Sequence, residues 1–443
     1  MPASRYKTVV DRVSADIRSG RLAPGTRLPT HRHLAAAEGM ALVTASRVYA
    51  ELQAMGLVSC ETGRGTFVRE TSLSPRHGTD QKTVAAGLCD LNFNYPTLPD
   101  QADLLRSGLR QLASSGDLDA LLRYQPHAGR PHERACVADH LRRRGLSVTA
   151  DHVLLVNGAQ QGLAVTLMAM LRPGDVIAAD ALTYSGFKVL AEALHLDIVP
   201  IPVREHGPDL EALATLCRQR PVRAVYAMPT LHNPLGWVMD GDQRQTLVEI
   251  ARRHDLWIVE DAAYAFLVED PPAPLATLAP ERTFYVSGLS KNVATGLRVG
   301  FIAAPAAHVA ALERVIRATT WNTPGIMTAL ACKWLEDGTV AQLEEQKRLD
   351  AQARQQVAAE ALSGLPYLSH SCSYFLWLPL TEDARADRVT VALMREGVAV
   401  STAEPFAVSA CVPHALRLAL GSVDRHVLRE GLEKVKWVVE GYL

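Results

Sequence analysis

The chain has 443 residues, of which 48% are hydrophobic and 21% are charged. This length and composition supply two to three domains with buried cores, and they exclude a disordered or fibrous protein. Lys and Arg number 46 against 47 Asp and Glu, yet residues 1–70 carry ten basic and six acidic side chains. A basic N-terminal part on a more acidic remainder indicates that this part alone meets a polyanion.

The seven cysteines are scattered, odd in number, and contain no pair at metal-ligand or redox spacing. This usage predicts a reducing compartment, no disulfide framework and no metal site. The N-terminus lacks the apolar core of a secretory signal, and the most apolar stretch, residues 162–171, is too short to span a bilayer. We therefore expect a soluble, cytoplasmic protein that has no membrane partner.

The first 70 residues have the pattern of three helices followed by a hairpin. Apolar residues at helical spacing predict the first helix over 6–19. Thr30 is expected to cap a short second helix over 31–38, and Thr44 to cap a third helix that ends near residue 55. A glycine-rich tip at 63–65 lies between two β-prone runs. The order predicts a winged helix-turn-helix, an α+β domain, in residues 1–70.

Residues 71–87 are rich in Ser, Thr, Gly and charge, which predicts a linker. From residue 88 to 443, apolar strand-like runs alternate with helical segments, a pattern typical of an α/β domain. Two further strands near residues 374–378 and 416–419 belong to a smaller C-terminal subdomain. The strands expected in the larger part are 153–156, 176–179, 222–226, 256–259, 283–286 and 299–303.

The stretches IRSGRLAPGTRLPTHRHLA, VTASRVYAELQAMGLV and GRGTFV span nearly all of residues 6–68. They resemble the DNA-binding domain of the GntR family of bacterial transcription regulators, which implies double-stranded operator DNA as a partner. Arginine can pair with guanine edges or phosphates, and a Gly-x-Gly tip allows close approach of the backbone. The DNA contacts that the resemblance implies are Arg32, Thr44, Ser46, Arg47, Arg64, Gly65 and Thr66.

Motifs in the larger part point to pyridoxal 5′-phosphate (PLP). The sequence Asn157-Gly158-Ala159-Gln160 would end a strand and open a helix, where backbone amides face an anion. Asp261 ends an apolar strand at the edge where α/β sheets bind ligands. Lys291, at the end of Ser-Gly-Leu-Ser-Lys, is followed seven residues later by Arg298. A carboxylate, a reactive amine and a phosphate clamp, in this chain order, suit that cofactor.

Over residues 88–443 these motifs resemble the fold-type I aminotransferases of class I. The resemblance implies that Lys291 forms the Schiff base with PLP and that Asp261 faces its pyridine nitrogen. Gly288 stands where the family commonly has Ser or Thr, so Ser290 is expected to contribute a phosphate contact instead. The implied cofactor contacts are Gly158, Ala159, Gln160, Tyr184, Asn233, Asp261, Tyr264, Ser290, Lys291, Arg298 and, across a homodimer interface, Tyr124.

Arg417 matches the arginine that grips the α-carboxylate of a substrate, and with Asn233 it is expected to bind an effector. A GntR-type domain joined to an aminotransferase-like domain resembles the MocR-type regulators. The resemblance implies a DNA-binding transcription regulator in which an amino acid or amine effector reacts with the PLP–lysine aldimine and changes operator binding. Two alternatives stay open: an active aminotransferase with an accessory DNA-binding domain, and a regulator that senses PLP itself, as a measure of vitamin B6 supply.

Overall fold

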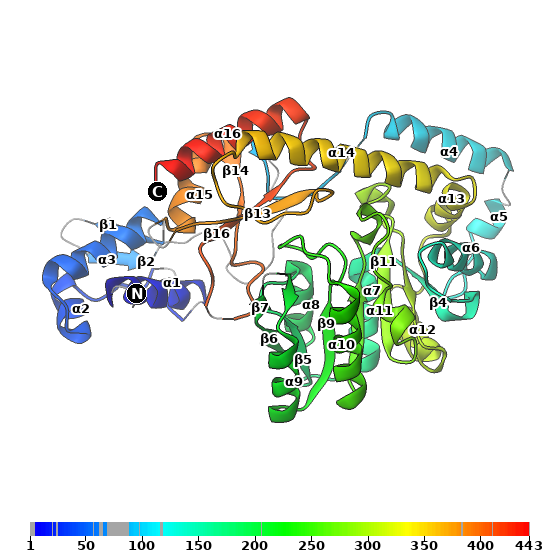
Figure 1. Cartoon of the computed structure of the whole chain (residues 1–443), viewed down its shortest axis with the longest axis horizontal. Coiled ribbons are helices and arrows are strands. Elements are labelled where there is room, and N and C mark those ends of the chain that lie inside the picture. Colours follow the sequence, from blue (N-terminus) through cyan, green and yellow to red (C-terminus); the bar gives the residue numbers. More distant parts are fainter. Residues whose placement is uncertain are drawn as a thin grey trace.

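The computed structural model describes residues 5–19, 21–23, 25–55, 57–61, 65–68, 88–96, 98–115, 118–204, 206–381, 384–409 and 411–442. The expected linker at 71–87 and the expected DNA contact Arg64 lie outside these ranges. Figure 1 shows three parts: an N-terminal domain, a large domain around one sheet, and a smaller C-terminal subdomain. No helix within the described ranges combines the length and the apolar character needed to cross a membrane.

The N-terminal domain packs three helices and a hairpin around a single apolar core. Thr30 caps the second helix as predicted, because its Oγ1 accepts the backbone N–H of His33 at 3.3 Å. The prediction for Thr44 is wrong: the third helix begins at Leu42, and the carbonyl of Ala41 already accepts a helical N–H, so Thr44 lies inside the first turn. The elements are α1 (Arg5–Arg18), α2 (His31–Glu38), α3 (Leu42–Ala54), β1 (Val58–Glu61) and β2 (Gly65–Val68).

A seven-stranded sheet forms the centre of the large domain, and six of its strands were predicted within two residues at each end. The edge strand Asp197–Ile201 was not predicted, because its Asp and Pro residues break the apolar pattern. β12 runs antiparallel to β4 and β11 on its two sides, and the other strand pairs of the sheet are parallel. In spatial order the strands are β4 (Val153–Val156), β12 (Gly300–Ala303), β11 (Thr283–Gly288), β10 (Trp257–Asp261), β9 (Val222–Ala227), β5 (Val176–Asp180) and β6 (Asp197–Ile201).

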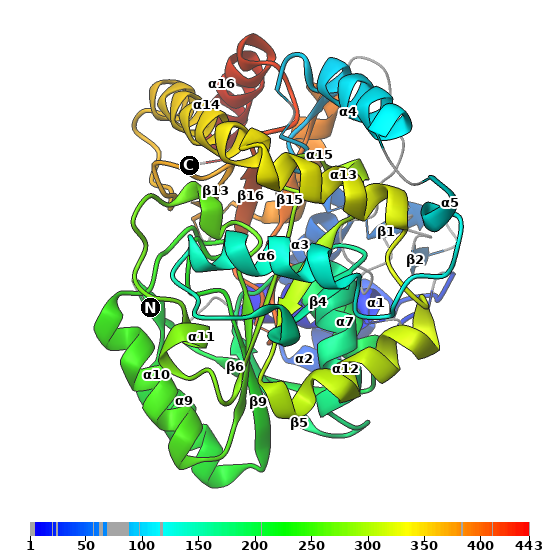
Figure 2. The same cartoon turned by 90° about the vertical axis from the view of Figure 1, so that its right-hand side faces the viewer.

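Helices cover both faces of this sheet, so its strands are buried on both sides. Figure 2 shows α7 and α12 on the side opposite to α9 and α10. The crossovers bring the carboxyl ends of the parallel strands to one edge, which is where ligands bind in such sheets. The helices around the sheet are α6 (Pro131–Arg142), α7 (Ala159–Met170), α8 (Ser185–Ala193), α9 (Leu210–Gln219), α10 (Gly241–Arg253), α11 (Leu275–Leu278) and α12 (Ala306–Thr319).

The long helix α14 (Thr339–Ala361) runs from the large domain into the small subdomain (Figure 1). The segment that follows the expected linker also joins this subdomain, since β3 (Cys89–Asp90) pairs with β14 (Val398–Ala399). The other elements are α4 (Gln101–Ser115), α5 (Leu118–Leu121), α13 (Gly325–Glu336), β7 (Val203–Arg204), β8 (Gly207–Pro208), β13 (Phe375–Pro379), α15 (Ala386–Arg395), β15 (Ser401–Thr402), β16 (Ala415–Ala419) and α16 (Arg425–Glu440).

Candidate functional site

Several predicted cofactor residues meet at the N-terminus of α7. Gly158 has φ +84°, a backbone conformation that favours glycine, and a Cβ built there would lie 2.8 Å from Nη2 of Arg298. Arg298, itself in the left-handed region with φ 50°, donates to the carbonyl of Asn157 at 2.9 Å and to Oγ of Ser290 at 3.5 Å. The first amides of the helix, a guanidinium and a hydroxyl thus border the same space, and these groups suit a phosphate.

The structure explains why glycine stands at position 288. A Cβ at Gly288 would lie 2.9 Å from the carbonyl oxygen of Val299 and 3.0 Å from Cα of Gly300, both backbone atoms next to or on β12. A Ser or Thr here would therefore push the neighbouring strand away. A hydroxyl for a phosphate must come from elsewhere, and Ser290 is the one that contacts Arg298.

Lys291 lies just beyond the carboxyl end of β11, at the ligand-binding edge of the sheet. Its Nζ donates to the carbonyl of Asn94 at 3.0 Å and lies 5.7 Å from the ring centroid of Tyr264. Tyr264 is buried and packs edge-on against Phe375, with 5.3 Å between ring centroids. The lysine amine and the phenol are thus placed together by two different strand ends.

Asp261 is buried at the end of β10 and accepts two hydrogen bonds. Its Oδ2 accepts the hydroxyl of Tyr226 at 2.7 Å, and its Oδ1 accepts the backbone N–H of Ala263 at 3.0 Å. Burial raises the pKa of this carboxyl, while the two hydrogen bonds oppose the rise. Tyr226, which lies 35 residues from Asp261 in the chain, was not among the predicted site residues. The available signal was its place near the end of the neighbouring parallel strand.

Tyr184 and Gln160 lie against the same backbone turn. A Cβ at Gly186 would lie 2.4 Å from the ring of Tyr184, and Nε2 of Gln160 donates to the carbonyl of Gly186 at 2.8 Å. Burial, followed by the charge of Asp261, raises the pKa of Tyr184. Asn233 is buried, and among the described residues its Oδ1 has no hydrogen-bond partner. An orphaned amide oxygen of this kind fits a site that takes a polar ligand.

Arg417 occupies β16 in the small subdomain and faces the large domain. Its Nη1 donates to the carbonyl of Asn92 at 2.6 Å, and its Nε has no partner within the described part of the chain. The guanidinium lies over the rings of Phe375 and Phe406, at 5.3 and 5.7 Å from their centroids. Phe375 also contacts Tyr264, so Arg417 is linked by packing to the surroundings of Lys291. A buried guanidinium with a spare donor suits a carboxylate.

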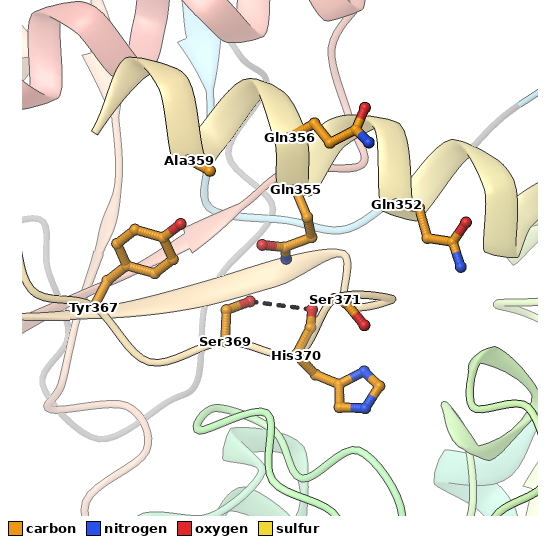
Figure 3. Close-up of a pocket in the computed structure, with 8 residues that line it drawn as sticks. All are labelled: Gln352, Gln355, Gln356, Ala359, Tyr367, Ser369, His370 and Ser371. Carbon is orange, nitrogen blue, oxygen red and sulfur yellow. Dashed lines mark hydrogen bonds between the residues drawn. The ribbon is translucent and has the colours of Figure 1, made fainter. Parts of the chain in front are cut away.

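Tyr124 does not enter this cluster within one chain. Its side chain is 86% exposed, and its ring lies 5.4 Å from that of Trp321 on the outer surface. A hollow of about 430 Å³ lies between α14 and the segment leading into β13 (Figure 3). It contains none of the predicted cofactor residues, and its lining is Gln352, Gln355, Gln356, Ala359, Tyr367, Ser369, His370 and Ser371.

Four of the predicted DNA contacts lie around one hollow of the N-terminal domain. Arg32, Ser46, Gly65 and Thr66 are among the residues that line a hollow of about 580 Å³ between α2, α3 and β2. Gly65 has φ +120°, and a Cβ there would lie 2.8 Å from Nε of Arg27, so the hairpin needs glycine at this point. Thr44 and Arg47 lie outside that lining on α3, and the guanidinium of Arg47 lies 4.5 Å from the ring centroid of Tyr6.

Two apolar side chains at the start of α3 were missed as candidate DNA contacts. Leu42 is 47% exposed and borders the hollow, while Val43 is 81% exposed. The signal was present in the sequence, since Leu and Val directly precede the polar residues expected to contact DNA. Apolar side chains at such positions can contact the methyl groups of thymines in the major groove.

Comparison with known proteins finds a family match for each part. Residues 86–435 match the family described as aminotransferase class I and II, and residues 5–68 match the bacterial regulatory proteins of the gntR family. The HTH-type transcriptional regulator YdeF of Bacillus subtilis is 28% identical over 94% of this chain and 90% of its own length. The probable rhizopine catabolism regulatory protein MocR of Rhizobium meliloti is 28% identical, covering 80% of this chain and 76% of that protein.

Proteins named only as aminotransferases are also similar to this chain. The arginine–pyruvate transaminase AruH of Pseudomonas aeruginosa is 31% identical over 72% of this chain and 84% of the enzyme. The crystal structure of an archaeal alanine:glyoxylate aminotransferase superimposes with a TM-score of 0.76, covering 80% of this chain and 91% of that chain at 24% identity, which shows the fold alone. The chain therefore belongs to the class I and II aminotransferase family and carries an N-terminal gntR-type helix-turn-helix domain, the architecture of HTH-type regulators that include MocR.

Proposed function

We propose that the chain is a PLP-dependent transcription regulator, in which an amino acid or amine reacts at Lys291 and thereby changes binding of the N-terminal domain to operator DNA. The observation that carries the proposal is the position of Lys291. Its Nζ lies 5.7 Å from the ring of Tyr264 at the ligand-binding edge of the sheet, in a chain whose other end is a gntR-type domain. A ligand-responsive regulator needs a reactive site and DNA contacts, and this chain has candidates for both.

The residues around Lys291 fit PLP in three respects: the glycine cradle at 158, the buried carboxylate of Asp261, and the orphaned amide oxygen of Asn233. When bound, PLP supplies an aldehyde that condenses with amines and an electron-withdrawing ring. Asp261 would hold the proton on the ring nitrogen, and Tyr184 would stack on the ring. The remaining contacts would be Gly158, Ala159, Gln160, Ser290 and Arg298 at the phosphate, with Asn233, Tyr264 and the partner subunit's Tyr124 around them.

The position of Arg417 favours an effector that carries a carboxylate. Its Nη1, now on the carbonyl of Asn92, and its Nη2 could form the paired hydrogen bonds that a carboxylate accepts from a guanidinium, and its Nε is a spare donor beside them. Asn233 would provide a second contact to the same ligand. An amino acid is thus the favoured effector class over a simple amine.

A homodimer belongs to the same proposal, because Tyr124 would reach the cofactor of the partner subunit only across an interface. Apolar side chains at 41–83% exposure on and beside α4 and α5 support such an interface, namely Leu105, Leu109, Leu118 and Leu122. The domain boundaries 1–70, 71–87 and 88–443 and a cytoplasmic location are also part of the proposal.

The test is a PLP titration of the full-length chain, followed by visible absorbance. We expect a band in the wild type that Lys291→Ala abolishes. Lys188→Ala is the matched control, because burial lowers the pKa of this second lysine to about 8 but it donates to the carbonyl of Glu404 at 3.1 Å instead. Amino acids that change the band should also change affinity for a DNA duplex selected by the wild type from a random pool. A wild type that shows only the absorbance of free PLP would refute the proposal.

A working aminotransferase is the second candidate, supported by the similarity to AruH and by the candidate positions of Asp261 and Arg417. Turnover with an amino acid plus 2-oxoglutarate, together with an absence of sequence-selective DNA binding, would favour it. A sensor of PLP itself is distinguished by the PLP-free chain: its operator affinity would change with PLP alone and show no further response to amines.

A further inference from the structure

Lys347, on α14, is fully buried beside Lys291 and is not used in the proposed function so far. Its Nζ donates to the carbonyls of Pro96, Lys291 and Val293 at 2.8, 2.9 and 2.7 Å. These three acceptors come from two segments far apart in the chain. One is the loop 289–293 that carries Lys291, and the other is the stretch 91–96, which we call the strap.

An ammonium matches this site because it has three N–H donors for three neutral carbonyls, whereas a neutral amine has two. Burial, and then the positive charge of Lys291, lowers the pKa of Lys347 to about 7. A chain that needed only an apolar filler here would place Met or Leu at this position and avoid the cost of burying a charge. The structure therefore indicates a role for the three donated hydrogen bonds.

The strap passes between the candidate ligand-binding residues and the small subdomain. Arg417 donates to the carbonyl of Asn92 at 2.6 Å, and Lys291 donates to the carbonyl of Asn94 at 3.0 Å. Lys347 donates to the carbonyl of Pro96, two residues further on. Three cationic side chains thus bind alternate carbonyls of one short segment. Ser422 adds a contact on the side of the small subdomain, since its Oγ accepts the N–H of Tyr95 at 2.9 Å.

Two of these three contacts involve groups that the proposed ligands would occupy. PLP would engage Lys291, and the carboxylate of an effector would engage Arg417. Each ligand therefore competes with a carbonyl of the strap for the N–H donors of that side chain. Lys347 binds the strap at a point that neither ligand needs. Residues 88–90 lie between residues 69–87 and the strap, and they include β3, which pairs with β14 of the small subdomain.

We propose that Lys347 is a positioning residue that fastens the strap to the Lys291 loop, so that the strap pivots at Pro96 when ligands take Lys291 and Arg417. The movement of the strap is then passed through β3 to the linker and to the DNA-binding domain. This inference rests on the proposed function, because it describes how the same site regulates DNA binding. A ligand shifts the strap only by the difference between its affinities for the two arrangements.

The test compares full-length variants loaded with PLP, using fluorescence anisotropy of the DNA duplex selected by the wild type. The measured quantity is the ratio of the larger to the smaller of two operator Kd values, one with and one without a saturating amino acid that changes the visible band. Lys347→Met keeps the length of the side chain but removes the donors, and we expect the ratio to fall by at least about fivefold. Lys347→Arg keeps charge and donors and is expected to restore much of it.

Arg348→Met is the matched control: its guanidinium, one residue further along α14, donates to the carbonyl of Phe266 at 3.0 Å and not to the strap. We expect its ratio to stay within about twofold of the wild type, well below a typical coupling. Ser422→Ala loosens the strap from its other side and serves where Lys347→Met does not fold. It should also lower the ratio.

The outcomes separate the two proposals. A wild type whose operator affinity ignores every amino acid that changes the band refutes the proposed function. A responsive wild type with an unchanged ratio in both Lys347→Met and Ser422→Ala overturns only the role of Lys347 and the strap. An equal fall in Arg348→Met would likewise overturn it, because the effect would then belong to α14 in general.

Discussion

The guanidinium of Arg385 lies 2.5 Å from Oδ1 of Asp11, which joins the small subdomain to helix α1 of the N-terminal domain. The side chain of Arg385 is 4% exposed, whereas that of Asp11 is 55% exposed. A second pair, Arg388 with Glu51 at 3.5 Å, extends the contact to α3. The N-terminal domain lies beside α15 (Figure 1), so a shift of this subdomain would act on α1 and α3 through these charged contacts.

Asp11→Asn should loosen this contact, because it removes the charge opposite a buried guanidinium whose Nε already lacks a partner among the described residues. We expect the free energy that this contact contributes to fall by about 1–2 kcal/mol, which is more than for an exposed ion pair. Faster amide hydrogen exchange in α1 would show that the contact is weaker. Arg12→Gln breaks the more exposed pair of Arg12 with Glu38 inside the N-terminal domain and should change exchange little. Equal exchange in the two variants would contradict the prediction.

Tyr226→Phe should weaken PLP binding by about tenfold, because the lost hydroxyl hydrogen bond supports the ionised form of Asp261. Without that bond the pKa of Asp261 rises further, and less carboxylate is present to hold a protonated pyridine nitrogen. Titration with PLP, followed by the visible band over a range of pH, measures both effects. Tyr285→Phe removes another buried phenol, from the next strand, and should leave PLP affinity near the wild-type value. Unchanged affinity in Tyr226→Phe would argue against a supporting role.

Glu260→Gln should stabilise the chain progressively as the pH rises from 5 to 7. Burial raises the pKa of Glu260 from 4.5 to about 7, although the N–H of Ala276 donates to Oε2 at 2.8 Å. The folded chain therefore holds a proton that the unfolded chain has lost, so wild-type stability falls as pH increases through this window. Glutamine cannot ionise, so the stability of the variant does not fall with pH through this group.

Calorimetric unfolding temperatures at several pH values measure the difference, which we expect to reach a few degrees by pH 7. Glu281→Gln is the control, because its pairing with Arg252 lowers the pKa of Glu281. The sign is then opposite: the pair stabilises at higher pH, and its contribution disappears on acidification. A constant offset for Glu260→Gln at all pH values would contradict the assignment.

Val43→Ala should reduce operator affinity by about fourfold if its exposed methyl groups meet a thymine methyl, since one buried methylene is worth about 0.8 kcal/mol. Replacing single thymines by uracil in the selected duplex should weaken the wild type at one position by a similar factor. Val43→Ala should be insensitive to that same replacement. Val203→Ala, on the large domain, is the control. A wild type indifferent to every uracil replacement would show that Val43 reads no methyl group.

Local features of the fold were predictable because they depend on neighbouring residues. Thr30 at the start of α2 and most strands of the large sheet follow from capping and apolar periodicity. At Thr44 the local signal did not mark the start of the helix. A hydroxyl before an apolar run is a good cap signal, but the helix had already started at Leu42. The boundary was decided by packing of α3 against α1 and α2.

The candidate site was predictable in part. The motif order placed Gly158, Asp261, Lys291 and Arg298 at strand ends, and these residues do lie along one edge of the sheet. The need for glycine at 288 could not be read from the chain, since the obstacle is the backbone at Val299 and Gly300 on the neighbouring strand. Tyr226 was missed for the same reason: only the parallel pairing of β9 with β10 brings it to Asp261.

The sequence by itself determined the two-part architecture, the order of the elements and the types of residue at the candidate site, because these depend on short motifs and on spacing along the chain. Only the tertiary structure decided which distant groups share donors and acceptors. Lys347 reads in the sequence as one more charge on a polar helix. It is buried because folding brings it to a carbonyl 251 residues away, and no local pattern encodes a hydrogen bond across that separation.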